Sequence, residues 1–179
     1  MSCDIIHSIE KFLPERGGMV YSCNQTVIYG SHGVCTVVDI EEKLVDHKPV
    51  EYYALEPLTQ PGTRYYIPVH NALAVSKMRL PLSKDALNVM LSKTDPDHSI
   101  WISSENARKN SYKEMLSNCD PENMLMVVRL LREHRDLQLA AGKKFHISDA
   151  NFLKTAETLL TAEIAFVFGI DKSEAFERI

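Results

Sequence analysis

The stretch from Thr26 to Val69 constrains the possible folds more than any other part of the chain. It contains three runs rich in β-branched and aromatic residues, and segments containing glycine, proline or aspartate separate them. The runs are Thr26–Lys43, Val50–Glu56 and Arg64–Val69. Short strands joined by tight turns predict a small, curled antiparallel sheet or barrel.

Tyrosine pairs and a glycine add detail to this stretch. Tyr52–Tyr53 and Tyr65–Tyr66 should each place one ring on each face of a strand, so one ring of each pair is expected in the core. Gly33 is expected at a turn where a positive φ or a close backbone approach excludes a Cβ atom. We interpret the neighbouring His32 as a turn residue, because no nucleophile or orienting acid lies at a recognisable spacing from it.

After Val69 the sequence changes from strand patterns to helical ones. Residues 70–82 form a transition, and capping residues define the helices that follow. The first expected helix is Lys84–Ser92, capped by Ser83, and the second runs from near Trp101 to Ser117. The third runs from Pro121 to Ala141 and is capped by Asp120. The fourth runs from its cap Ser148 to Gly169, and residues 171–179 are expected to form a last turn. Apolar side chains at helical spacing predict the buried faces. They are Met124, Val127, Val128 and Leu131, and then Phe152, Ala156, Leu159, Leu160, Ile164 and Val167.

The composition is that of an ordinary globular protein, with 45% hydrophobic and 25% charged residues. No run approaches the roughly 18 apolar residues of a membrane span, and no secretory signal is visible. The four cysteines form no Cys-x-x-Cys pair and have no histidine at metal-ligand spacing. We therefore expect a cytoplasmic protein with reduced thiols, no metal, no cofactor and no membrane partner.

The sequence contains no recognisable catalytic motif. Gly142-Lys143-Lys144 lacks the upstream glycine and the Ser or Thr of a phosphate-binding loop, and it follows a predicted helix rather than a strand. Glu133-His134 lacks the second histidine of a zinc protease. We therefore predict that the protein is not an enzyme and has no small-molecule substrate.

The charge distribution limits how the chain can contact nucleic acid. The net charge of −4 is carried by residues 1–70, because Lys and Arg balance Asp and Glu in residues 71–179. A protein that binds nucleic acid over its whole surface is expected to be basic. Any contact with DNA must therefore come from a local basic face.

Several segments, in the same order, resemble one family of bacterial transcription factors. They are Val27–Val34 (VIYGSHGV), Glu51–Leu55 (EYYAL), Tyr66–Val69 followed by Asn71-Ala72, Trp101-Ile102, and Tyr112–Asp120. Together they resemble the CarD/CdnL family, whose RNA-polymerase-interacting module is shared with transcription-repair coupling factors. The resemblance covers residues 20–170 and implies an α+β fold, in which a small antiparallel Tudor-like β barrel precedes a compact helical bundle.

The resemblance also implies a polymerase-binding surface on the β block. In this family the block docks on the lobe of the polymerase β subunit, partly by extending the sheet of that lobe. The family contacts correspond here to Lys43, Arg64 and Tyr66. The family often has arginine at the position of Tyr66, so a charge-assisted hydrogen bond would be lost there while a large contact surface is kept. The alternative is that Lys43 and Arg64 only solvate the sheet.

The helical half carries the expectation of promoter DNA binding. The resemblance implies that Trp101 wedges into the minor groove at the upstream edge of melted DNA. The alternative is a packing residue between the two domains. Basic residues on the predicted helices can neutralise phosphates without reading the base sequence, or can belong to a solvated face balanced by acids. These DNA-contact candidates are Arg108, Lys109, Lys113, Arg132, Lys143 and Lys144.

These inferences predict three segments and one main function. Residues 1–18 are an extension, and Met19 is a candidate for the true start. Residues 19–72 are expected to be the polymerase-interacting domain and residues 73–179 the DNA-contacting domain. The expected function is a regulator that binds the polymerase β subunit and promoter DNA and thereby stabilises the open complex. The alternative is a protein-interaction adaptor that uses the β module without contacting DNA.

Overall fold

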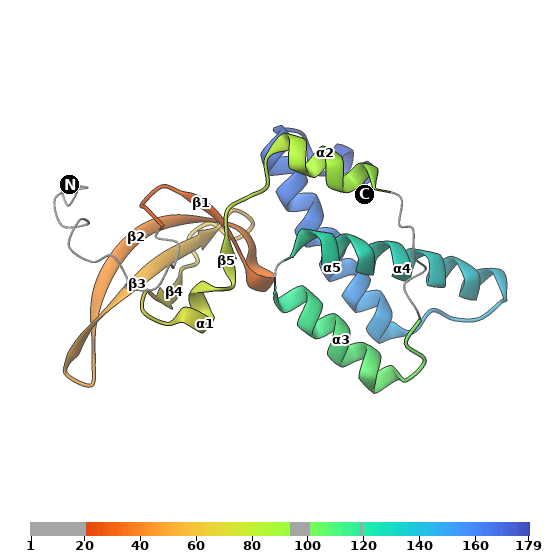
Figure 1. Ribbon diagram of the computed structural model, residues 1–179, viewed down its shortest axis with the longest axis horizontal. Coiled ribbons are helices and arrows are strands. Elements are labelled where there is room, and N and C mark those ends of the chain that lie inside the picture. Colours follow the sequence, from red (N-terminus) through yellow and green to blue (C-terminus); the bar gives the residue numbers. More distant parts are fainter. Residues whose placement is uncertain (1–20, 94–100, 119) are drawn as a thin grey trace.

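The computed structural model describes residues 21–93, 101–118 and 120–179, and the chain is an α+β protein. A five-stranded antiparallel sheet lies at one end, and helices occupy the other (Figure 1). The strands are β1 (Thr26–Tyr29), β2 (Gly33–Val45), β3 (Lys48–Pro57), β4 (Tyr65–Pro68) and β5 (Met78–Arg79). The three expected runs are confirmed as strands, and the 3-10 turn η2 (Gly30–His32) divides the first run into β1 and β2. The expected extension 1–18 and the candidate start Met19 lie outside the described residues.

The hairpin of β2 and β3 is the longest part of the sheet, and its tip projects away from the helices (Figure 1). At the tip, Asp46 and His47 both have positive φ, of 50° and 62°. This conformation gives a tight turn whose twist matches that of the flanking strands. A register shift between Val37 and Asp39 marks a bulge, which increases the local twist of β2.

The sheet is open, which corrects the expectation of a closed barrel. The strand order is β4-β3-β2-β1-β5, and within the described ranges no pairing joins β4 to β5. Both edge strands are short, with four residues in β4 and two in β5. Residues 70–82, expected to be a transition, contain β5 and also the helix α1 (Ala72–Val75), which the Asn71 side chain caps.

In the part of the chain that the structure describes, five longer helices follow the sheet. They are α2 (Lys84–Ser92), α3 (Glu105–Ser117), α4 (Pro121–Ala140), α5 (Ile147–Phe168) and α6 (Lys172–Glu177). The Ser83 and Asp120 caps are confirmed, and Gly169 ends α5 in a left-handed conformation. Two predictions were wrong. Trp101 precedes α3 instead of lying within it, and the cap of α5 is His146, whose Nδ1 accepts a hydrogen bond from the backbone N–H of Ser148.

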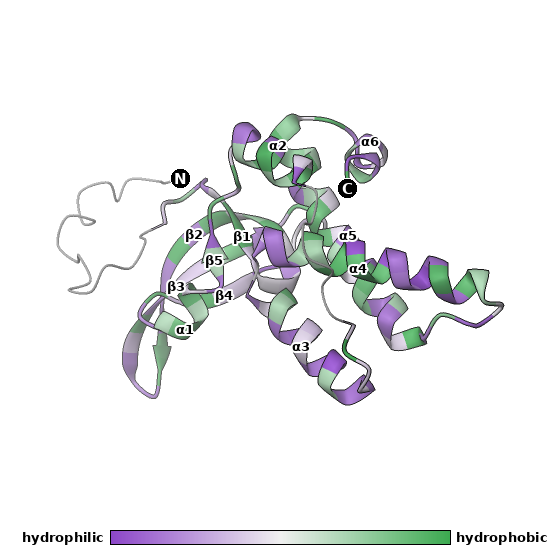
Figure 2. Ribbon diagram, turned by 45° about the vertical axis from the view of Figure 1, so that its right-hand side comes forward, coloured by the Kyte–Doolittle hydropathy of each residue, from purple (hydrophilic) through white to green (hydrophobic). Residues whose placement is uncertain are grey.

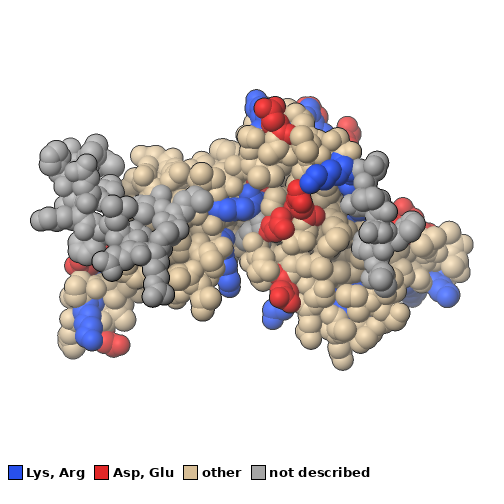
Figure 3. Space-filling model, in the orientation of Figure 1, with Lys and Arg blue, Asp and Glu red and all other residues tan. Residues whose placement is uncertain are grey.

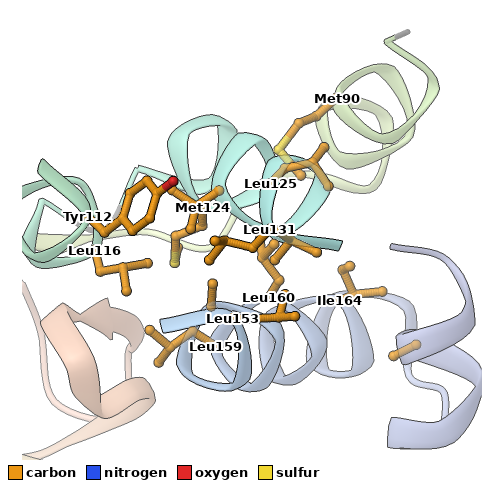
Figure 4. Packing of buried hydrophobic residues seen from close by; sticks show 14 of the residues in the cluster. Met90, Tyr112, Leu116, Met124, Leu125, Leu131, Leu153, Leu159, Leu160 and Ile164 are labelled. Atoms are coloured by element: carbon orange, nitrogen blue, oxygen red, sulfur yellow. The ribbon is translucent and has the colours of Figure 1, made fainter. Parts of the chain in front are cut away.

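The helices share one hydrophobic cluster, to which α2 to α6 all contribute (Figure 4). The predicted apolar face of α4 is buried throughout, and on α5 only Phe152 and Val167 of the predicted stripe are partly exposed. Hydrophobic and hydrophilic residues alternate along α3 and α4, as in amphipathic helices (Figure 2). None of the described helices is long and apolar enough to cross a membrane.

The sheet packs directly against α5. Gly33 has a φ of 70°, and a Cβ atom there would lie 3.3 Å from Cδ2 of Leu159. The two reasons given for this glycine, positive φ and close approach, are therefore both confirmed. Beside it, Ile28 and Val34 are buried against Ala162. The Gly30–His32 turn also contacts α3 and α5, so the sheet and the helices meet over several elements.

Candidate functional site

The two faces of the sheet have different environments. One face forms a core with Tyr53 and Ile67 at its centre, and Tyr21 closes it by an edge-to-face contact with Tyr53. The other face carries Tyr52 and Tyr66, whose rings are in edge-to-face contact with their centroids 6.5 Å apart. The prediction of one buried ring is confirmed for Tyr52–Tyr53. In the second pair, Tyr66 is 38% exposed and Tyr65 is half-buried.

Lys43 and Tyr66, two of the predicted polymerase contacts, lie against each other on this outer face. The Lys43 Nζ atom is 2.9 Å from the centroid of the Tyr66 ring, which is a cation–π contact. Lys43 also lies 3.5 Å from Glu41 on the same strand. The cluster therefore presents an aromatic ring and a partly shared positive charge, held in place before any partner binds.

Within the described residues, the outer edge of the neighbouring strand β4 pairs with no other strand. β4 is an edge strand, and it pairs with β3 only from Tyr52 to Leu55. Arg64 immediately precedes β4 and is exposed to solvent. An edge of this kind has unpaired backbone groups that can add a strand from another protein. Lys43 and Tyr66 thus lie together on one face of the sheet, and Arg64 lies at the start of the β4 edge strand.

Trp101 lies against α4 in the helical part of the chain. Its ring stacks on His134, with 3.4 Å between ring centroids and 17° between ring planes. The guanidinium of Arg108 lies 4.4 Å from the Trp101 ring centroid. Trp101 is partly buried and packs on the helical core, not between the sheet and the helices. These contacts favour a packing role for Trp101, although it packs within the helical part and not between the two domains as the alternative expected.

Arg108 is buried, in contrast to the expectation of a solvent-facing phosphate contact. It is 5% exposed and forms a two-armed ion pair with Asp149, with distances of 3.0 Å and 2.8 Å. Its remaining arm donates to the carbonyl of Ile102 at 2.9 Å. The hydrogen bond to Asp149 raises the pKa of Arg108 further, so the pair stays charged. We therefore leave Arg108 out of the proposed DNA contacts.

Two titratable rings next to this pair are also affected by burial. Burial lowers the pKa of His134, so its ring stacks on Trp101 as the neutral imidazole near neutral pH. Burial raises the pKa of Tyr112 to about 12. The Tyr112 hydroxyl is buried without a hydrogen-bond partner among the described residues.

The other basic candidates fall into two groups. Lys109 forms an ion pair with Glu105 one turn earlier on α3. Arg132 binds Glu157 at 2.8 Å and the carbonyl of Ile179, and its guanidinium lies over Phe176. These two side chains are held by contacts within the chain.

Lys113, Lys143 and Lys144 are exposed and form no ion pair with a described residue. Lys113 is on α3, and the other two lie in the connection between α4 and α5. On the face shown in Figure 3, Lys and Arg side chains are scattered and alternate with acids. On this face the basic side chains form no continuous patch.

A buried ion pair between the sheet and the helices was not predicted from the sequence. Arg79 at the end of β5 donates to both carboxylate oxygens of Glu163 on α5, at 2.7 Å and 2.6 Å. The Glu163 side chain is only 2% exposed, and its Oε1 also accepts from the backbone N–H of Leu82. The one available signal was a glutamate inside the apolar stripe of a predicted helix, because a buried charge needs a partner.

Together, the open sheet edge, the preformed aromatic–lysine cluster and the helices packed behind them define a β-sheet interaction domain joined to a helical part. Residues 21–79 match the family model described as the CarD-like/TRCF RID domain. This segment is a CarD-like RNA-polymerase-interacting domain. The match ends at Arg79, the last residue of β5 and the partner of Glu163.

Proposed function

We propose that the protein is a non-enzymatic bacterial regulator of transcription initiation that acts in the cytoplasm. The sheet binds the β subunit of RNA polymerase, and the helical part contacts promoter DNA and stabilises the open complex. The observation that carries the proposal is the family match over residues 21–79, which ends at the pair that connects the sheet to α5. In this arrangement, residues 19–72 contribute most of the polymerase-binding domain and residues 73–179 form a compact DNA-contacting bundle.

The polymerase contacts are proposed to be Lys43, Arg64 and Tyr66. The cluster of Lys43 and Tyr66 supports this, because a cation–π pair at an exposed strand end supplies contact area with little loss of side-chain freedom on binding. Arg64 adds an exposed charge next to the β4 edge. Titration of the full chain with the purified polymerase β lobe tests this half of the proposal.

The DNA contacts are proposed to come first from Lys113, Lys143 and Lys144, with Lys109 and Arg132 in supporting positions. The first three are exposed and have no ion pair with a described residue, whereas the other two are held by acids. Phosphate contacts of this kind do not read sequence. For Trp101, the stacking on His134 supports packing, and the minor-groove wedge is the competing proposal.

The second candidate function is an adaptor that binds polymerase without touching DNA. The net charge of −4 and the scattered basic side chains on the face shown in Figure 3 favour it. Retention of the chain on promoter duplex, with and without polymerase and over a range of salt concentrations, separates the two functions. DNA contact requires binding that weakens as salt rises, because phosphate contacts release counterions. Polymerase binding with no salt-dependent retention on duplex supports the adaptor.

A further inference from the structure

A cleft of about 400 Å³ lies where the η2 turn of the sheet meets the helices α3 and α5. The sheet side contributes the turn Gly30–His32 and Lys77, and α3 contributes Lys113 and Ser117. Both parts of the chain therefore build its walls. Its volume falls within the roughly 300–1,000 Å³ that is common for small-molecule sites.

The charge of the cleft favours an anion. Lys77 and Lys113 line it from opposite parts of the fold, and no Asp or Glu is among the described residues that line it. Lys113 forms no ion pair with a described residue, whereas Lys109, one turn earlier on the same helix, is paired with Glu105. Lysine side chains that converge in a cleft without acids attract phosphate groups.

The remaining walls favour a flat ring next to that anion. Tyr29 and Phe152 line the cleft. His32 stacks on Tyr29 with a centroid distance of 5.6 Å and is tilted against Tyr65 at 3.9 Å. These rings are thus held in position. Burial lowers the pKa of His32, so near neutral pH it can both donate and accept a hydrogen bond. Aromatic walls beside lysines are the usual means of holding a base and its phosphate.

We propose that this cleft binds a nucleotide. Lys77 and Lys113 contact the phosphate, and the base lies against Tyr29 and Phe152. A free nucleotide and one nucleotide of a single-stranded nucleic acid both offer this combination of a phosphate and a base. Either ligand would touch the sheet and the helices at once, and would therefore stabilise their present relative position. The inference does not depend on binding to promoter duplex.

Titration of the full chain with deoxyadenosine monophosphate, followed by backbone amide NMR signals, tests the proposal. We expect the signals of Ser31, Ser117 and Thr155 to shift, and deoxyadenosine, which lacks the phosphate, to bind at least fivefold more weakly. Lys113→Glu should weaken binding of the monophosphate at least tenfold. The control is Lys84→Glu, at an exposed lysine on α2 that does not line the cleft, and it should change the affinity less than twofold. Thermal melting confirms that both variants are folded.

A short single-stranded deoxyadenosine oligonucleotide identifies the source of the nucleotide. Binding more than tenfold tighter than the monophosphate, with the same amide shifts, assigns the site to a strand, and equal or weaker binding assigns it to a free nucleotide. The proposal is overturned if neither ligand shifts these amides at millimolar concentration, if deoxyadenosine binds as tightly as the monophosphate, or if Lys113→Glu binds normally. Retention on duplex and binding to the β lobe are measured separately from nucleotide binding. Failure of the proposed function can therefore be distinguished from failure of the nucleotide proposal.

Discussion

Arg79 and Glu163, which lie 84 residues apart in the sequence, form a two-armed ion pair that joins the last strand of the sheet to the longest helix. The carboxylate is buried, and the backbone N–H of Leu82 satisfies it further. Removal of one partner from such a pair leaves a buried, uncompensated charge or an empty site. The pair therefore controls how firmly the polymerase-interacting sheet is attached to the helices.

The first prediction concerns the stability contributed by this pair. Arg79→Met should lower the free energy of unfolding by about 3 kcal/mol, because Glu163 would keep its charge without a counterion. Urea denaturation measures the change. The control is Lys93→Met, which removes an exposed ion pair with Glu122. That change should cost about 0.5 kcal/mol or less. Equal losses in the two variants would contradict the prediction.

The second prediction concerns polymerase binding. Arg64→Glu should weaken binding of the full chain to the β lobe by about 1–3 kcal/mol, since it reverses an interface charge next to the β4 edge. Lys154→Glu makes the same charge change at an exposed site on α5 and should leave the affinity unchanged. Calorimetric titration measures both. Wild-type affinity in Arg64→Glu would remove this residue from the interface.

The third prediction concerns the salt dependence of DNA binding. Replacement of both Lys143 and Lys144 by alanine should reduce the slope of log affinity against log salt by about 2, if each side chain contacts one phosphate. Binding to different duplex sequences should fall by a similar factor. Filter or column retention of the polymerase-bound protein on duplex gives the slope. A slope that does not change would place any DNA contact elsewhere on the chain.

The fourth prediction separates the two roles of Trp101. If the ring packs between His134 and Arg108, Trp101→Ala should lower the free energy of unfolding by about 2–4 kcal/mol. This loss is towards the low end of that expected for truncation of a large buried ring, because Trp101 is partly exposed. If it is a wedge, the variant should melt normally and shorten the lifetime of the open complex. Thermal melting and promoter-complex decay on one preparation distinguish these results. We expect the stability loss.

The fifth prediction uses the buried hydroxyl of Tyr112. Burial raises the pKa of this hydroxyl to about 12. In the unfolded chain it ionises near pH 10, so the wild type should lose stability as the pH rises from 10 towards 12, by on the order of 2–3 kcal/mol. Tyr112→Phe should lose that part of the pH dependence. At neutral pH it should be as stable as the wild type or more so, because the hydroxyl has no described partner. Urea titrations at pH 7 and pH 11 compare the two proteins, and a large loss at pH 7 would show an unrecognised hydrogen bond.

Local signals explain which parts of the fold could be predicted from the sequence. Ser83 and Asp120 cap their helices through side-chain contacts two or three residues away, so the information lies within one turn. The β2–β3 hairpin is likewise specified by alternation and by its own turn. The strand β5 has two residues and exists only because β1 lies beside it, so no local pattern could reveal it.

The parts of the site that could not be predicted depend on partners far along the chain. Arg108 has the spacing of an exposed helical residue, and only the fold brings Asp149 to it from 41 positions away. Lys43 and Tyr66 were identified by resemblance, but their mutual contact follows from the register of β2, β3 and β4. Closure of the sheet also depends on the geometry of all five strands together.

The position of β5 bears on how the polymerase-interacting domain can be produced as a fragment. A fragment that ends at Ala72 lacks β5 and leaves the outer edge of β1 unpaired. It also uncovers Ile28 and Val34, which α5 covers in the full chain. An unpaired edge next to exposed aliphatic side chains promotes edge-to-edge association. A fragment for interaction studies should therefore continue past Arg79 and carry polar substitutions at the two aliphatic positions, or should retain α5.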